Sequence, residues 1–182
     1  MIRITFAFCF LFISCSKEKD YSRPSLSYLA LGDSYTIGES IEIEDSYPNQ
    51  LKEKIDLIDS LKIIAKTGWT TDELIDTLNN SNLKQYDIVS LLIGVNNQFR
   101  GYDIDNYKVE FENLLTKTIK YSNSKKNVFV LSIPDYGVTP FGESRGKEKI
   151  YDEINAYNDI NREISEKYNI MYFNITDISR RA

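Results

Sequence analysis

The sequence predicts a single α/β domain, a three-layer α/β/α sandwich built on a five-stranded, mostly parallel sheet. Three observations lead to this expectation. Five short apolar segments alternate with segments of helical periodicity from residue 26 to the end of the chain. Helical crossovers between parallel strands are right-handed and cover both faces of a sheet. The length of 182 residues suits one domain and leaves little room for a second.

The first predicted elements are a strand, a helix and a second strand. Residues 26–31 are mostly apolar and end at a glycine, which is typical of a short buried strand. Residues 47–58 show helical spacing, with Ser46 as a candidate N-cap and Pro48 in the first turn, where proline is tolerated. Residues 61–65 are again apolar and predict the second strand.

A capped helix, a strongly apolar strand and an amphipathic helix follow. Thr-Thr-Asp-Glu at residues 70–73 is a capping-box pattern and predicts a helix that extends to about residue 78. Residues 86–93 are apolar enough for a third strand that is covered on both faces. The next helix has one apolar face, which carries Tyr107, Phe111, Leu114, Leu115, Thr118 and Ile119.

The last part of the chain predicts a strand, a long helix and a strand. Residues 127–133 form the fourth apolar segment, and residues 170–175 form the fifth. Residues 147–168 between them have helical spacing, with an apolar stripe of Ile150, Ile154, Tyr157, Ile160 and Ile164. This completes the alternation of strands and helices that a mostly parallel sheet requires.

The composition excludes several classes of function. The net charge of −5 argues against nucleic-acid binding, because nucleic-acid binders normally present a basic surface. The chain contains no histidine, so residues 1–182 alone cannot assemble a histidine-ligated zinc site, a Cys–His pair or a Ser–His–Asp triad. The carboxylates are scattered along the sequence, and we expect neither a metal ion nor another cofactor.

Residues 1–14 are expected to be a lipoprotein signal peptide, and residues 15–25 a flexible tether that precedes the domain. Residues 1–14 carry one arginine and then an apolar run that ends in a small residue, as secretory signal peptides do. The residues before Cys15 resemble the lipobox of bacterial lipoproteins, which implies acylation of Cys15 and a lipid anchor in the bacterial cell envelope. Residues 15–25 would then tether the domain at 26–182 to the membrane. The alternative is an ordinary signal peptide with an incidental cysteine.

Residues suited to acyl chemistry follow three successive predicted strands. Ser34 comes after the first strand, Gly68 after the second and Asn96 after the third. Ligands bind beyond the carboxyl ends of strands in such sheets, so we expect these residues to meet at one edge. A serine hydroxyl can attack an acyl carbon, while the backbone amides of Ser34 and Gly68 and the Asn96 carboxamide can stabilise an oxyanion. Taken singly, each stretch is as typical of an ordinary turn.

Together these stretches resemble the SGNH (GDSL) hydrolase family of esterases and lipases. Gly32-Asp33-Ser34 matches the first block of that family, Gly68 matches the second, and Gly94 with Asn96 matches the third. The resemblance extends over nearly the whole of residues 26–182. It implies a flavodoxin-like sheet and a serine esterase that acts on a small acyl ester or a lysophospholipid-type substrate.

The resemblance also implies the roles of individual residues. Ser34 would be the nucleophile, and Gly68 and Asn96 would complete the oxyanion hole. The residues beside them are expected to contact substrate, namely Asp33, Tyr35, Trp69 and Asn97. Phe99, Tyr102 and Phe141 suggest a further aromatic lining. Residues 39–45 are expected to form either a rim of the site or a solvated acidic loop.

Two features depart from the family pattern. Asn97 stands where the third block usually has an aspartate. The Asp-x-x-His block that supplies the base is absent, and the sequence stops at Ala182, just after the fifth predicted strand. We therefore expect the domain to be C-terminally incomplete, with part of one sheet face exposed. We also expect little or no turnover from residues 1–182 alone.

Two other functions remain compatible with these residues. One is a catalytically inactive binding lipoprotein that keeps the same fold without a base. The other is a flavodoxin-like nucleotide binder, because residues 34–38 are faintly similar to a phosphate loop. That stretch lacks the clustered glycines that bring several amides to a phosphate. The sequence does not predict an oligomeric state.

Overall fold

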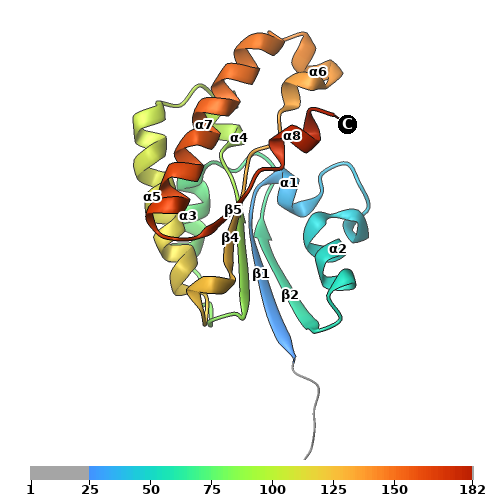
Figure 1. The fold of residues 1–182 in the computed structure, drawn as a ribbon, viewed down its shortest axis with the longest axis vertical. Helices are drawn as coiled ribbons and strands as arrows, with labels where there is room; N and C mark the ends of the chain where they lie inside the picture. The colour runs from blue at the N-terminus through green and yellow to red at the C-terminus, as the bar shows by residue number, and fades with distance from the viewer. Residues whose placement is uncertain (1–24, 182) are drawn as a thin grey trace, which may run out of the picture.

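The computed structural model describes residues 25–181 and shows one sheet of parallel strands (Figure 1). The strands are β1 (Leu26–Gly32), β2 (Ile58–Ala65), β3 (Ile88–Leu92), β4 (Val128–Leu131) and β5 (Met171–Phe173). Their order across the sheet is β2-β1-β3-β4-β5, and every neighbouring pair is parallel. The predicted five-stranded α/β fold is confirmed. The predicted signal peptide, Cys15 and all but the last residue of the tether lie outside the described residues.

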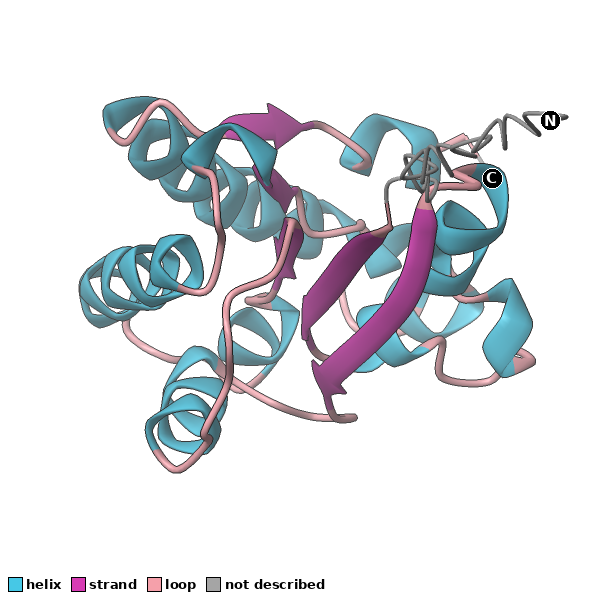
Figure 2. Ribbon diagram, turned by 90° about the horizontal axis from the view of Figure 1, so that it is seen from below, coloured by secondary structure: helices cyan, strands magenta, loops and turns pink. Residues whose placement is uncertain are grey.

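Helices pack on both faces of the sheet, and one face is covered by more helices than the other (Figure 2). One face carries α3 (Thr71–Asn79), α5 (Ile104–Lys120) and α7 (Lys147–Lys167), and the other carries α2 (Tyr47–Lys54). Leu29 and Leu31 of β1 are fully buried in the larger core, which includes residues of all three helices. Tyr28 and Ala30 alternate with them and face a smaller core against α2.

The capping box predicted for α3 is present, and most of the apolar stripes predicted for α5 and α7 are buried. Glu73 accepts a hydrogen bond from the Thr70 amide at 2.9 Å, which completes the capping box of α3. Asp103 caps α5 by accepting from the Asn106 amide at 2.9 Å. The predicted stripe of α5 is buried from Tyr107 to Thr118. Among the helices of residues 25–181, none combines the length and apolar character needed to cross a membrane.

The boundary between α2 and β2 differs from the prediction. The helix ends at Lys54, residues 55–57 form a turn, and the strand begins at Ile58, so only Ile58 of the predicted helix belongs to the strand. Ile58 is buried in the smaller core and pairs with Leu26 of β1, which outweighs its helical spacing. Ser46 occupies the N-cap position, but its hydroxyl donates to the Ile43 carbonyl at 2.7 Å instead of capping the helix.

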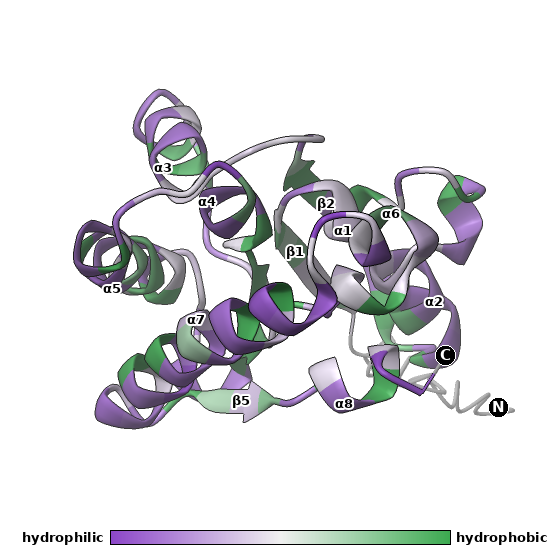
Figure 3. Ribbon diagram, turned by 90° about the horizontal axis from the view of Figure 1, so that it is seen from above, coloured by the Kyte–Doolittle hydropathy of each residue, from purple (hydrophilic) through white to green (hydrophobic). Residues whose placement is uncertain are grey.

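Several short helices lie at the carboxyl edge of the sheet and were not predicted. They are α1 (Ser34–Ile37), α4 (Val95–Phe99), α6 (Pro140–Glu143), α8 (Thr176–Ser179) and the 3₁₀ turn η3 (Tyr136–Val138). Figure 3, which looks down onto this edge, shows α1, α4 and α6 around the end of β1. Segments of three to five residues are too short to display a hydrophobic period, so the sequence pattern does not predict them as helices.

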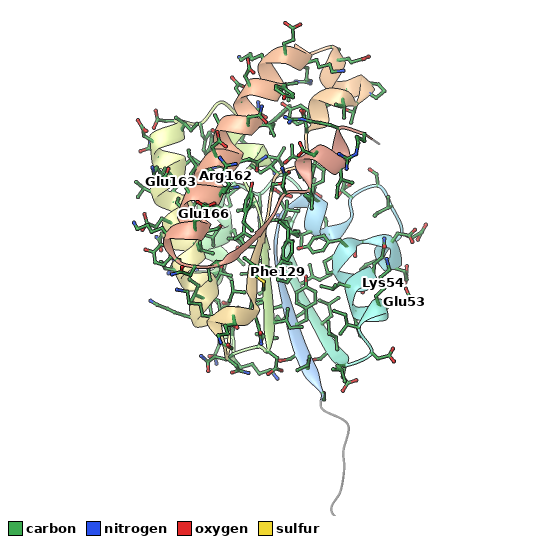
Figure 4. All side chains as sticks on the ribbon, viewed as in Figure 1. Glu53, Lys54, Phe129, Arg162, Glu163 and Glu166 are labelled. Carbon is green, nitrogen blue, oxygen red and sulfur yellow. The ribbon has the colours of Figure 1, made fainter. Side chains whose placement is uncertain are left out.

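The face that carries α2 is covered only in part. Phe129 of β4 and Phe173 of β5 line an open apolar groove of about 530 Å³ together with Leu51 and Lys54 of α2. Met171 and Phe173 remain 49% and 48% exposed. Figure 4 labels Phe129 in the sheet and Lys54 on α2. The second helical layer of the sandwich is therefore a single helix beside β1 and β2.

Candidate active site

Ser34 is held at the end of β1 by a tight turn from strand to helix. β1 ends at Gly32, and Ser34 is the first residue of the one-turn helix α1. A Cβ on Gly32 would lie 2.0 Å from Thr36 Oγ1 and 2.3 Å from the Leu92 carbonyl oxygen, so only glycine fits where β1, β3 and α1 meet. Ser34 is half-buried, and no group within residues 25–181 forms a hydrogen bond with its hydroxyl.

Asp33 lies beneath this turn and is fully buried. Its Oδ1 accepts a hydrogen bond from the Tyr35 amide at 3.0 Å, whereas its Oδ2 has no partner among the described residues. Burial raises the pKa of the Asp33 carboxyl to about 7, which the bond from Tyr35 only partly opposes. Asp33 thus caps α1 from inside the protein, and its position does not support the predicted contact with substrate.

Gly68 supplies a backbone amide close to the same edge. It lies in the turn between β2 and α3 with φ +84°, in the left-handed region that favours glycine. Its carbonyl accepts a hydrogen bond from Arg100 Nη2 at 2.6 Å. Within residues 25–181, neither the Gly68 amide nor the Ser34 amide donates a hydrogen bond. Two backbone donors therefore remain available at the ends of two adjacent strands.

Asn96, the second residue of α4, adds a side-chain donor. Its Nδ2 donates to the Trp69 carbonyl at 2.9 Å, which ties α4 to the turn that contains Gly68. A carboxamide nitrogen has two hydrogens, and this bond uses one of them. Asn96 and Ser34 line one cavity, so the structure brings these two predicted residues together.

Asn97 and Trp69 are not part of that lining. Asn97 is fully buried; its Oδ1 accepts from the Thr71 amide at 3.1 Å and its Nδ2 donates to Thr71 Oγ1 at 2.7 Å. Both polar atoms are thus used to join α4 to α3, and the predicted contact of Asn97 with substrate finds no support. Trp69 is half-buried against the larger core and offers its carbonyl to Asn96. Tyr102, a further predicted lining residue, also lies outside the cavity.

The cavity itself has a volume of about 780 Å³ and is lined by residues from the four segments that follow β1, β2, β3 and β4. Tyr35 lines it as predicted, and Glu39, Ser40 and Ile41 form part of its rim. Its aromatic wall consists of Phe99, Tyr136 and Phe141, with the ring centroids of Phe99 and Phe141 6.0 Å apart. The sequence analysis missed Tyr136, although its position just after the fourth strand is the signal that identified Ser34 and Asn96.

The described residues provide a nucleophile and donors, but no imidazole and no ready metal site. Residues 25–181 contain no cluster of three or more His, Cys, Asp or Glu side chains placed to hold a metal ion. The whole chain has no histidine. The arrangement can therefore bind and polarise an acyl group.

Comparisons with known proteins agree with this fold and its edge. The model of the GDSL-like Lipase/Acylhydrolase family matches residues 30–182. A member of the lipolytic G-D-S-L family from Veillonella parvula has a similar solved structure, with 12% identity, a TM-score of 0.66 and coverage of 84% of this chain and 79% of that chain. Phospholipase A1 from Streptomyces albidoflavus has 18% identity, a TM-score of 0.63 and coverage of 84% and 80%. No curated protein matches the sequence.

The structural likenesses establish the fold, and the family model extends from the last residues of β1 over the other four strands and the edge that carries Ser34, Gly68 and Asn96. The chain belongs to the GDSL-like lipase/acylhydrolase family, a family of ester hydrolases.

Proposed function

We propose that this protein is a serine esterase that cleaves a small acyl ester or a lysophospholipid-type ester through an acyl-enzyme on Ser34. The main observation in support of this proposal is that Ser34 and Asn96 line the same cavity. This cavity of about 780 Å³ is also lined by Thr67, the residue before Gly68. The amides of Ser34 and Gly68 donate no hydrogen bond within the described residues. The apolar wall of Phe99 and Phe141 suits an acyl chain.

The proposed reaction has two halves. Ser34 Oγ forms a bond to the acyl carbon, and the carbonyl oxygen takes the negative charge of the tetrahedral intermediate. The amides of Ser34 and Gly68 and the free hydrogen of Asn96 Nδ2 donate to that oxyanion. The carbon–oxygen bond to the alcohol then breaks, the alcohol leaves with a proton, and water hydrolyses the acyl-enzyme to release the acid and restore Ser34.

When Ser34 attacks, a base must accept the proton of its hydroxyl group. Residues 1–182 contain no histidine that could be this base. In subtilisin, loss of the triad histidine lowers turnover by about 10⁶. We therefore expect slow hydrolysis by this chain alone. Added imidazole supplies the missing type of base in solution, and it should raise the rate if the other components are in place.

The test compares the hydrolysis of p-nitrophenyl butyrate by the native sequence and by Ser34→Ala, each with and without imidazole. The Ser34→Ala protein serves as the control for hydrolysis by imidazole itself. We expect imidazole to increase turnover only when Ser34 is present. An equal increase in both proteins would remove Ser34 from the reaction, and fast turnover without imidazole would show that another base is present.

A binding protein with this fold is the second candidate, and the lack of histidine is the observation that favours it. Such a protein would use the cavity to hold an ester without cleaving it. It would bind p-nitrophenyl butyrate, and imidazole would not raise turnover in the presence of Ser34. The same pair of assays therefore separates the two candidates.

We further propose that the protein is anchored in the bacterial cell envelope through a lipid on Cys15. The support is the lipobox-like stretch before Cys15 and the polar residues after it. With Cys15→Ser, we expect the protein to move from the membrane fraction to the soluble fraction and to lose incorporation of labelled palmitate. Retention of the label in that variant would contradict the anchor.

A further inference from the structure

A second, smaller cavity adjoins the wall of the one that contains Ser34. It has a volume of about 290 Å³, and Phe99 and Tyr136 line both cavities. Three cationic side chains line it, Arg100, Arg145 and Lys149, against one carboxylate, Glu153. The smaller cavity is therefore a basic pocket that shares a wall with the cavity of Ser34 at the carboxyl edge of the sheet.

Arg145 is the cation of this set that has no ion pair within residues 25–181. Arg100 is paired with Glu73 at 3.5 Å and also donates to the Gly68 carbonyl. Lys149 pairs with Glu153 at 3.7 Å, and Glu153 also accepts from Gln98 at 2.7 Å. The charge of Arg145 is thus the one left to be matched by a ligand.

The aromatic wall positions the Arg145 guanidinium. Its central carbon lies 4.3 Å from the ring centroid of Phe141 and 5.1 Å from that of Phe99. Stacking of this kind restricts a flexible arginine while leaving the edge of the guanidinium, with its N–H donors, open. Because both rings also line the larger cavity, Arg145 stands next to the space where an ester would bind to Ser34.

Part of the rim of the larger cavity carries negative charge. Glu39 lines it directly, and Glu42, Glu44 and Asp45 follow in the same exposed loop. A ligand with a negative group is repelled at this rim and attracted at the end with Arg145 and Lys149. The charge distribution therefore favours one orientation of an anionic ester.

We propose that the ester cleaved at Ser34 carries an anionic oxyacid group, a carboxylate or a phosphate, and that Arg145 binds this group in the smaller cavity with help from Lys149. This inference rests on the proposed esterase function and names the class of substrate. Arg145 is a specificity-determining residue in this account, since it binds the group remote from the scissile bond.

The test measures binding, so that it does not depend on turnover. Monomethyl adipate and dimethyl adipate have the same carbon chain and differ in one negative charge, and calorimetry gives the Kd of each. We expect the anionic ester to bind about tenfold more tightly, since hydrogen bonds to charged groups commonly contribute that much. The preference should shrink as salt is raised, because Arg145 is exposed.

Arg145→Gln should remove the preference and leave the Kd of dimethyl adipate unchanged. Arg162→Gln is the matched control, because Arg162 is an exposed arginine of α7 that lines neither cavity. It should keep the preference. If dimethyl adipate binds but the native protein shows no preference, or if both variants behave alike, the role of Arg145 is overturned while the ester site stands. If neither ester binds, both the inference and the proposed function fail.

Discussion

At the scale of single residues, Asp33 has the most unusual chemistry in the site. Its carboxyl is fully buried directly before the nucleophile, with one oxygen unpartnered among the described residues and a pKa raised to about 7. The raised pKa means that folding disfavours the charged form. The protein is therefore stabilised relative to the unfolded chain while Asp33 is protonated, and this advantage is lost as the pH rises from about 4 to about 7.

Asp33→Asn should isolate this effect, because the amide oxygen can still accept from the Tyr35 amide while carrying no charge. We expect the free energy of unfolding of the variant, relative to the native protein, to rise by up to about 4 kcal/mol between pH 4 and pH 8. Urea titrations at several pH values measure the difference. Parallel stability profiles for the two proteins would show that Asp33 does not titrate in this range.

At the scale of elements, Asn96 and Asn97, which are adjacent in α4, have different roles. Asn97 joins α4 to α3 through two buried hydrogen bonds to Thr71, whereas Asn96 lines the cavity. Asn97→Ala leaves the buried Thr71 amide without its acceptor, while Thr71 Oγ1 keeps its bond to Glu110, and should cost about 1–3 kcal/mol of stability. Asn96→Ala should cost less stability but lower the imidazole-supported kcat by about 10²–10³ with little change in KM. Thermal melts measure the stability of both variants, and steady-state kinetics measure their kcat and KM. A larger loss of kcat in Asn97→Ala and a larger loss of stability in Asn96→Ala would contradict these roles.

The sequence identified the five strands and the long helices because they are periodic or strongly apolar. It located Ser34, Gly68 and Asn96 because they follow strands that turned out to be adjacent and parallel. It did not separate Asn96 from Asn97, since the direction of each side chain depends on the short helix α4. The end of α2 was missed because Ile58 keeps the helical spacing while its pairing with Leu26 decides its structure.

At the scale of the whole molecule, packing on the two faces of the sheet contributes unequally to the stability of the protein. Phe111 of α5 is fully buried in the larger core, whereas Phe173 of β5 is 48% exposed on the groove beside α2. Phe111→Ala should cost about 3–5 kcal/mol, and Phe173→Ala about 1 kcal/mol. Denaturant unfolding of both variants measures the contrast. Equal losses would mean that the open face is packed as tightly as the other.

The central claim is that Ser34, at the edge where the strands end, is the nucleophile of an esterase. The most direct measurement is peptide mapping by mass spectrometry after reaction with a fluorophosphonate in the presence of imidazole. We predict a single phosphonyl group on the peptide that contains Ser34, and none in Ser34→Ala. Modification of another residue, or no modification under conditions where esters are cleaved, would contradict the account.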